Sequence, residues 1–271
     1  MSVTKVLTIA GSDSLSGGGL QADLRTYKEY NIEGSNVLTC IVTVAPNTDE
    51  VTVLGVSLPT LKAQLRECLS KENEIDVIKI GMLADIEIAK VVANHLKEVK
   101  DSPIVLDPVL ALKESGLTSS QDIIDFFNTE LMPLATITTP NLREAELLSG
   151  LVGIDSIEKM EEAARIIHKT GVKNVVVKGG QRLKGETAYD VLFDGTTVTI
   201  LEEKKLANSY NNGAGCTFAS AIASGIATGL TVEESVRKGK AFVFESIEYG
   251  IPFLPGLGNV YQGGKNKSLQ E

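Results

Sequence analysis

Short apolar runs rich in valine, isoleucine and threonine alternate with longer segments of helical spacing, and this alternation constrains the fold more than any other feature. The runs expected to form strands are residues 3–10, 37–44, 77–80, 104–106, 135–138 and 175–177. The segments with helical spacing are residues 20–30, 58–69, 86–99, 122–131, 141–148 and 156–170. Strands that alternate with helices of roughly 10–15 residues indicate βαβ units. The pattern therefore predicts an α/β fold whose central, mostly parallel β-sheet has helices on both faces.

The last third of the chain continues with a hairpin and two helices. Residues 188–193 and 197–201 flank Asp194-Gly195, a dipeptide typical of tight hairpins. Residues 214–228 and 232–249 are expected to be the helices that close the fold. No linker or internal repeat interrupts the chain, so residues 1–271 are predicted to form one domain. The polar residues 263–271 are expected to form a frayed tail.

The composition argues against several classes of protein. Asp and Glu number 35 against 26 Lys and Arg, and this net charge of −9 disfavours a nucleic-acid or anionic-membrane partner. No run reaches the ~18 apolar residues of a membrane span, and no signal-peptide pattern is recognised, so we expect a cytoplasmic protein. Three widely spaced cysteines and two histidines predict neither a disulfide scaffold nor a zinc site.

Polar and glycine-rich segments follow several of the expected strands. They are residues 11–19, Gly81-Met82, Asp107-Pro108, Pro140-Asn141 and Lys178-Gly179-Gly180. In open α/β sheets, ligands bind beyond the carboxyl ends of the strands. We therefore expect these segments to converge on one site, which favours an enzyme over a structural protein.

Residues 211–220 (NNGAGCTFAS) form the strongest candidate for chemistry. Gly213, Ala214 and Gly215 lead directly into an apolar helix, where backbone N–H groups and the helix dipole can form an anion hole. The same field would lower the pKa of the Cys216 thiol. The alternative is a glycine-rich turn into a packed helix, with Cys216 as a small buried apolar residue.

Residues 11–26 (GSDSLSGGGLQADLRT) follow the first strand and open a helix. They lack the GxGxxG spacing of a dinucleotide site. Asp13 is placed to hydrogen-bond a polar substrate group, and the alternative is a turn capped by Asp13 or Ser14.

Three further segments carry groups suited to phosphates and a cation. Lys178 could place an ammonium near phosphate oxygens, and Asp107, Asn141 and Glu144 offer oxygen ligands of the kind that hold Mg²⁺. The alternative for Asn141 and Glu144 is a helix capping box.

The remaining histidines, cysteines and a methionine are weaker candidates. His95 and His168 are interpreted as surface or boundary residues, and Cys40 and Cys68 as core residues. Met82 is expected either to line a pocket or to pack in the core.

Six ordered blocks together resemble the vitamin-kinase branch of the ribokinase-like superfamily. The blocks are GSDSLSGGGLQADLRT, IKIGML, VLDPVLALK, TPNLREAELLSG, VVVKGG and GAGCTFASAIASG. That branch contains hydroxymethylpyrimidine (phosphate) kinases and a group of bacterial pyridoxal kinases. The resemblance covers nearly the whole chain and is weakest after Tyr249. It implies a ribokinase-like α/β fold, a homodimer, and phosphorylation of a ring hydroxymethyl group by ATP with Mg²⁺.

The resemblance also implies a role for each matching residue. Cys216 would take the place of the usual aspartate base, above an anion hole of Gly213, Ala214 and Gly215. The residues implied to bind ATP are Lys178, Gly180, Asn141 and Thr217, and those implied to serve the metal are Asp107 and Glu144. The residues implied to bind the ring substrate are Asp13, Gly19, Val44, Gly81, Met82 and Val109.

Departures from the family pattern bear on the substrate. Val44 stands where hydroxymethylpyrimidine kinases have a glutamine that reads the pyrimidine edge, and valine cannot make those hydrogen bonds. Leu112 and Asn212 replace a lid cysteine and a histidine found in some of the pyridoxal kinases. These residues favour a kinase for pyridoxal, pyridoxine and pyridoxamine. The alternatives are a hydroxymethylpyrimidine (phosphate) kinase and a vitamin-binding relative without catalysis.

Overall fold

A single nine-stranded sheet organises the computed structural model, which describes residues 3–45, 51–99, 101–110, 120–208, 210–254 and 257–264. The strand order is β3-β2-β1-β4-β5-β6-β7-β8-β9. The six central strands, β2, β1, β4, β5, β6 and β7, pair in parallel. Strand β3 at one edge and strands β8 and β9 at the other pair antiparallel. The strands are β1 (Lys5–Asp13), β2 (Glu33–Val44), β3 (Val51–Gly55), β4 (Val77–Ile80), β5 (Ile104–Leu106), β6 (Ile137–Thr138), β7 (Asn174–Lys178), β8 (Thr187–Phe193) and β9 (Val198–Lys204).

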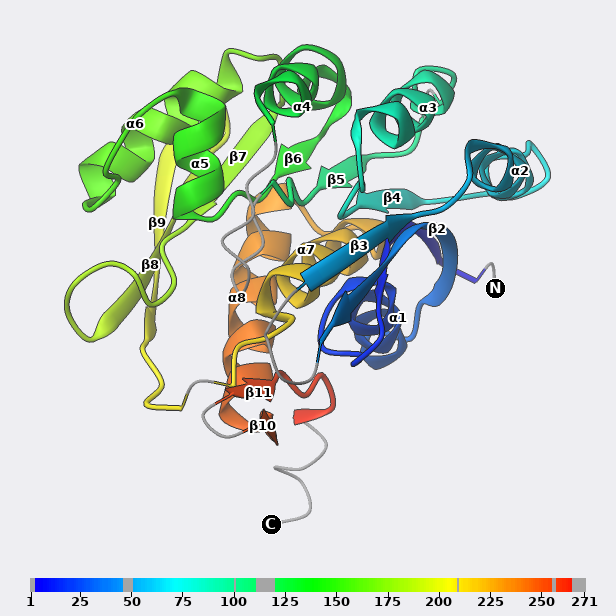
Figure 1. Cartoon of the computed structure of the whole chain (residues 1–271). Helices are drawn as coiled ribbons and strands as arrows, with labels where there is room; N and C mark the ends of the chain where they lie inside the picture. The colour runs from blue at the N-terminus through cyan, green and yellow to red at the C-terminus, as the bar shows by residue number, and fades with distance from the viewer. Residues whose placement is uncertain are drawn as a thin grey trace.

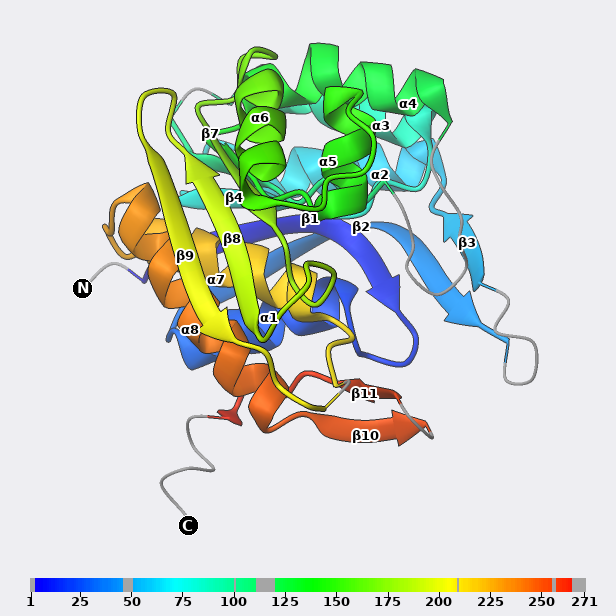
Figure 2. The same cartoon turned by 90° about the vertical axis from the view of Figure 1, so that its left-hand side faces the viewer.

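Helices cover both faces of this sheet (Figures 1 and 2). One face carries α1 (Gly19–Glu29), α7 (Ala214–Ala227) and α8 (Val232–Glu248). The other carries α2 (Leu58–Cys68), α3 (Ile86–Leu96), α4 (Gln121–Phe126), α5 (Leu142–Ser149) and α6 (Ile157–His168). Each face has its own buried apolar cluster, since strand residues alternate between the two sides. The predicted three-layer α/β architecture is confirmed.

The structure differs from the sequence prediction in three places. Strand β3 was not expected, because its five residues lie at a sheet edge and are largely exposed. The helix predicted over residues 122–131 ends at Phe126 and continues as a π-helical turn (Phe127–Leu131) and a 3₁₀ turn (Met132–Leu134). The chain also does not close with α8, because a small antiparallel pair, β10 (Ile251–Leu254) and β11 (Leu257–Asn259), follows it.

Fraying of the tail from residue 263 stays a prediction. Gly264 is buried, and its N–H donates to the Tyr261 carbonyl at 3.2 Å. Residues 265–271 lie outside the described residues.

Other sequence expectations are met by the described residues. Cys40 is buried in β2 and Cys68 half-buried on α2. His95 and His168 are half-buried on α3 and α6, and the His168 ring packs edge-on against Phe193. None of the helices in the described ranges is long and apolar enough to cross a membrane.

Candidate active site

The loop after β1 and the start of α7 meet at Cys216. We call residues 14–18 the glycine loop. A Cβ added to Gly18 would lie 3.7 Å from Cys216 Sγ and 3.9 Å from Asp13 Oδ2. Gly213 has a left-handed backbone (φ 84°), and a side chain there would overlap the Gly17 carbonyl. Glycine is therefore required at Gly213, whereas a Cβ on Gly18 would make only ordinary van der Waals contacts.

Asp13 holds the glycine loop in shape. Its Oδ1 accepts the Leu15 amide at 2.9 Å, and its Oδ2 accepts the amides of Gly17 and Gly18 at 3.0 and 2.9 Å. The capped turn that the sequence allowed as an alternative is therefore present. A direct bond from Asp13 to a substrate stays a prediction.

The amides at the start of α7 differ in one donor from the predicted anion hole. The first i→i−4 bond of the helix runs from the Thr217 amide to the Gly213 carbonyl at 2.9 Å, so earlier amides have no partner within the helix. The Ala214 amide instead donates to the Asn211 carbonyl at 3.1 Å. We therefore leave Ala214 out of the predicted donors Gly213, Ala214 and Gly215. The Cys216 amide, which also precedes the first helical bond, is a further candidate donor that the sequence analysis did not include.

Lys178 lies at the end of β7 and faces the same helix terminus. Its Nζ is 3.2 Å from Asp107 Oδ1, and a Cβ on Gly215 would lie 3.5 Å from Nζ. Burial alone would lower the pKa of Lys178, but Asp107 and Glu144 raise it above its usual value. Asp107 is buried and also accepts the Thr139 hydroxyl at 3.0 Å. An ammonium is thus held beside the start of α7, where the anion hole is predicted.

Asn141 and Glu144 form the capping box that the sequence allowed as an alternative. Asn141 Oδ1 accepts the amides of Arg143 and Glu144, and Glu144 Oε2 accepts the Asn141 amide at 2.9 Å. Asn141 forms an isolated bridge to Lys178, so the start of α5 lies beside β7. No group of three or more His, Cys, Asp or Glu in the described ranges is arranged to hold a metal.

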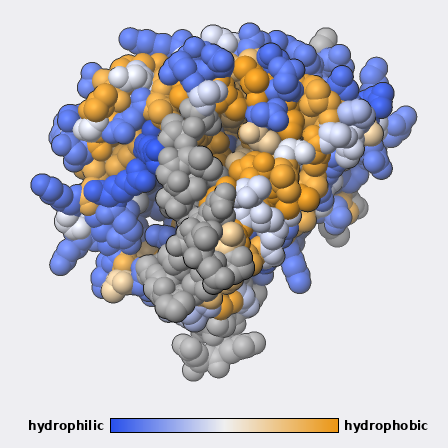
Figure 3. Space-filling view, viewed as in Figure 1, coloured by the Kyte–Doolittle hydropathy of each residue, from blue (hydrophilic) through white to orange (hydrophobic). Residues whose placement is uncertain are grey.

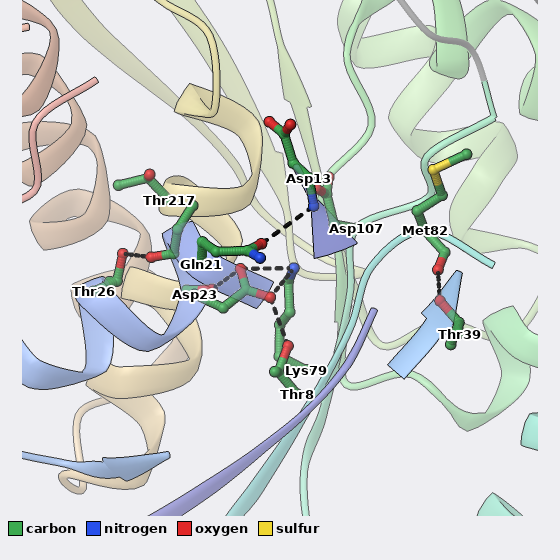
Figure 4. A network of polar contacts seen from close by, with 12 residues as sticks. Thr8, Asp13, Gln21, Asp23, Thr26, Thr39, Lys79, Met82, Asp107 and Thr217 are labelled. Atoms are coloured by element: carbon green, nitrogen blue, oxygen red, sulfur yellow. Dashed lines mark hydrogen bonds and ion pairs between the residues drawn. The ribbon is translucent and has the colours of Figure 1, made fainter. Parts of the chain in front are cut away.

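A fully buried ion pair lies beneath the site, and the sequence analysis did not single it out. Lys79 Nζ on β4 donates to both carboxylate oxygens of Asp23 on α1 at 2.9 Å (Figure 4). The hydroxyls of Thr8 and Ser220 donate to the same carboxylate at 2.6 Å. A lysine within the apolar run VIKI was the available signal, since buried lysines are rare unless paired.

The pKa of Cys216 moves in the direction opposite to the prediction. Burial raises the pKa of its thiol to about 11, and the nearby carboxylates Asp23 and Asp107 add to the rise. Lys79 and a hydrogen bond from the Gly19 amide act the other way but are outweighed. The expected lowering of the pKa is therefore wrong, because the desolvation of this half-buried thiol and the two carboxylates outweigh Lys79 and the Gly19 amide.

The predicted lining of the ring pocket occupies the adjacent strand ends. Val44 is half-buried at the end of β2, two residues beyond the pairing of Asp13 with Val42. Met82 is half-buried, and its carbonyl accepts the Thr39 hydroxyl at 2.7 Å. Gly81 is needed because a Cβ would lie 2.9 Å from Lys79 Nζ. Val109 is half-buried two residues after Asp107, and Leu112 lies outside the described residues.

Two residues predicted to bind the nucleotide are placed very differently. Gly180 is exposed in a left-handed turn (φ 52°) after β7, and its contact with the nucleotide stays a prediction. Thr217 is fully buried, and its hydroxyl accepts the side-chain amide of Gln262 at 3.0 Å. Thr217 faces inward, so we correct its predicted contact with ATP to a structural one.

Comparison of the sequence with known proteins identifies a family. The chain matches the family described as phosphomethylpyrimidine kinase over residues 13–261. The chain belongs to this family. It is 39% identical to the pyridoxine kinase of Bacillus subtilis over 259 residues, covering 95% of each chain. It is also 34% identical to the hydroxymethylpyrimidine/phosphomethylpyrimidine kinase of Haemophilus influenzae, covering 94% of this chain and 95% of the relative.

Solved structures agree with these relatives and with the fold. The pyridoxal kinase of Staphylococcus aureus in complex with AMP-PCP and pyridoxal superposes with a TM-score of 0.92 at 38% identity, covering 98% of this chain and 96% of that chain. This likeness confirms the ribokinase-like vitamin-kinase fold expected from the sequence. The chain thus belongs to a family of phosphotransferases that act on an alcohol group.

Proposed function

We propose that this kinase transfers the γ-phosphoryl group of ATP to the hydroxymethyl group of pyridoxal, pyridoxine or pyridoxamine. The observation that carries the proposal is the meeting of Cys216, the glycine loop and the Lys178–Asp107 pair at one helix terminus. The apolar Val44 at the ring side supports a pyridine over an aminopyrimidine substrate. The similar kinases of Bacillus subtilis and Staphylococcus aureus are named for pyridoxine and pyridoxal.

Each group of the site has a distinct task in this proposal. The amides of Gly213, Gly215 and Cys216, with the Lys178 ammonium, stabilise the charge that spreads over the transferring phosphoryl oxygens. The thiolate form of Cys216 accepts the proton of the substrate hydroxyl and becomes the neutral thiol. Because its pKa is about 11 in the ligand-free protein, only about 1 thiol in 10⁴ is ionised at neutral pH.

The oxygen donors of the site fit a mostly hydrated Mg²⁺. Protein sites for Mg²⁺ bound to ATP use one or two carboxylates, with waters and phosphates as the other ligands. Asp107 and the buried Glu144 both lie close enough to Lys178 to raise its pKa. These two carboxylates would hold the cation, which when bound neutralises phosphate charge.

The hydroxymethylpyrimidine (phosphate) kinase activity is the second candidate, favoured by the family match and by the Haemophilus influenzae relative. ADP release in the presence of each vitamer and of hydroxymethylpyrimidine separates the two. We expect the highest kcat/KM with a B6 vitamer, and a clear pyrimidine preference would overturn this. Ligand-induced thermal stabilisation without any ADP release would instead indicate a binding protein.

A homodimer is part of the proposal. Figure 3 shows apolar side chains gathered over β3, the edge strand of the sheet. Ile41 and Leu54 form a cross-strand pair there and are 40% and 56% exposed. An exposed apolar sheet edge is a surface that a second copy would cover. Sedimentation velocity at micromolar concentration tests this, and a monomer would refute it.

A further inference from the structure

The segment that follows α8 contacts both the start of α7 and, through Arg25, the glycine loop. We call residues 257–264 the C-terminal segment. The Asn212 amide donates to the Gly258 carbonyl at 3.1 Å, and the Val260 amide donates to the Asn212 carbonyl at 3.0 Å. The side-chain amide of Asn212 donates to Asn259 Oδ1 at 2.8 Å. The residue directly before Gly213 is therefore held by the C-terminal segment.

Gln262 extends this contact into the protein. Its side chain is 2% exposed, and both polar atoms of its amide are used. Nε2 donates to the hydroxyl of Thr217, which directly follows Cys216, at 3.0 Å. Oε1 accepts Arg25 Nε at 2.9 Å, and the Arg25 guanidinium also donates to the Ser16 carbonyl of the glycine loop.

One amide group therefore joins the first turn of α7 to the glycine loop. These are the two segments whose contact, between Gly18 and Cys216, forms the centre of the site. A continuous series of hydrogen bonds runs from Thr217 through Gln262 and Arg25 to Ser16. Shifts of about 1 Å between reacting groups can cost about 10²-fold in rate.

We propose that Gln262 is a positioning residue, which sets the glycine loop against the Cys216 terminus of α7 without touching substrate. The expected loss of kcat rests on the proposed kinase function. The expected loosening of the two segments does not depend on that function. Lys178 and Gly180, the other residues proposed to bind ATP, lie on β7 and the turn after it. Only the amides at the start of α7 connect Gln262 to ATP, so we expect the affinity for ATP to change less than kcat. The expected defect lies in kcat.

The test replaces Gln262 by residues that keep its size. Gln262→Met removes both hydrogen bonds, and we expect kcat to fall by about 10–100-fold with the Kd of ATP changed less than about threefold. Gln262→Glu should recover most of kcat, because a carboxylate accepts from Arg25 and the Thr217 hydroxyl can also act as donor. Should Gln262→Met fail to fold, Thr217→Val breaks only the Nε2 bond and carries the same test.

Gln64→Met is the matched control. The Gln64 amide bonds to the Leu38 backbone at 2.9 and 3.2 Å, and its Nε2 also donates to the Thr60 carbonyl of its own helix at 3.5 Å. It therefore joins α2 to β2 instead of two segments of the site. We expect this variant to lower the melting temperature while kcat, measured well below melting, stays within about twofold. An equal loss of kcat in both variants would overturn the positioning role.

Amide hydrogen exchange provides a readout that needs no turnover. Peptides spanning residues 13–19 and 213–217 should exchange faster in Gln262→Met than in the wild type, and should not change in Gln64→Met. Unchanged exchange in these peptides, or a kcat within twofold of wild type, refutes the inference. Absence of turnover in the wild-type protein would refute the proposed function instead, and the exchange result would still decide the role of Gln262.

Discussion

Replacing Lys79 by methionine tests the energetics of the charge pair beneath the site. In the folded protein Lys79 and Asp23 are both fully buried, with Nζ 2.9 Å from each carboxylate oxygen. Without the ammonium, Asp23 keeps the two hydroxyl donors Thr8 and Ser220 but has no cation. An uncompensated buried charge of this kind costs about 3–5 kcal/mol. That is a large part of the ~5–15 kcal/mol by which a domain is stable.

The double variant Asp23→Asn with Lys79→Met separates lost charge from lost packing. It removes both charges, and the new amide can donate to a hydroxyl of Thr8 or Ser220, since hydroxyls both donate and accept. We expect the double variant to be at least ~2 kcal/mol more stable than Lys79→Met alone. The assay is equilibrium unfolding in urea, followed by circular dichroism.

The control is a lysine whose ion pair is exposed. Lys90 pairs with Glu87 at 2.8 Å on α3, and the two side chains are 48% and 61% exposed. Lys90→Met should leave the urea midpoint nearly unchanged. A loss below about 1 kcal/mol for Lys79→Met, or a double variant no more stable than it, would refute the reasoning.

The effect of Lys79 on stability should not depend on pH over the ordinary range. Burial would lower the pKa of Lys79, but Asp23, with Cys216, Asp107 and Tyr27, raises it above its usual value. A group whose pKa is raised on folding contributes fully below its unfolded pKa, which is about 10.4 for lysine. The contribution is therefore complete at pH 7 and is lost only in strong alkali.

Three further predictions concern turnover. Cys216→Ala should lower kcat by about 10²–10⁴-fold with little change in the Kd of the ring substrate, and near-native kcat would make Cys216 a packing residue. Because the pKa of Cys216 is about 11, the kcat/KM of the wild type should rise with pH from neutrality to about pH 10. In Cys216→Asp this rise of kcat/KM with pH should disappear. A flat wild-type profile would show that the thiolate of the free enzyme is not the base. Val44→Gln should raise kcat/KM for hydroxymethylpyrimidine relative to pyridoxal, and an unchanged ratio would mean that Val44 does not face the substrate.

Local patterns in the sequence determined the layers of the fold and the position of the site. The period of the apolar residues predicted the parallel strands β1, β2, β4, β5, β6 and β7, because their central residues are buried and read as short apolar runs. Where this burial is missing, prediction failed, as for the exposed edge strand β3. The convergence of Asp107 and Lys178 followed from the rule that parallel strands end at one edge of the sheet. Residues 213–216 follow no parallel strand, and their place beside these groups was implied only by the family resemblance.

Only the tertiary structure decided the pKa values and hydrogen-bond partners of the groups in the site. The start of α7 predicted a lowered pKa for Cys216, but burial and the carboxylates of Asp23 and Asp107 raise it. The direction Thr217 faces, and its bond to Gln262 45 residues later, could not be read from local spacing. Periodicity reports whether a residue lies on a buried face, whereas pKa and hydrogen-bond partners depend on every segment packed around the group. These segments come from distant parts of the chain, and so the chemistry of the site became visible only when the chain was folded.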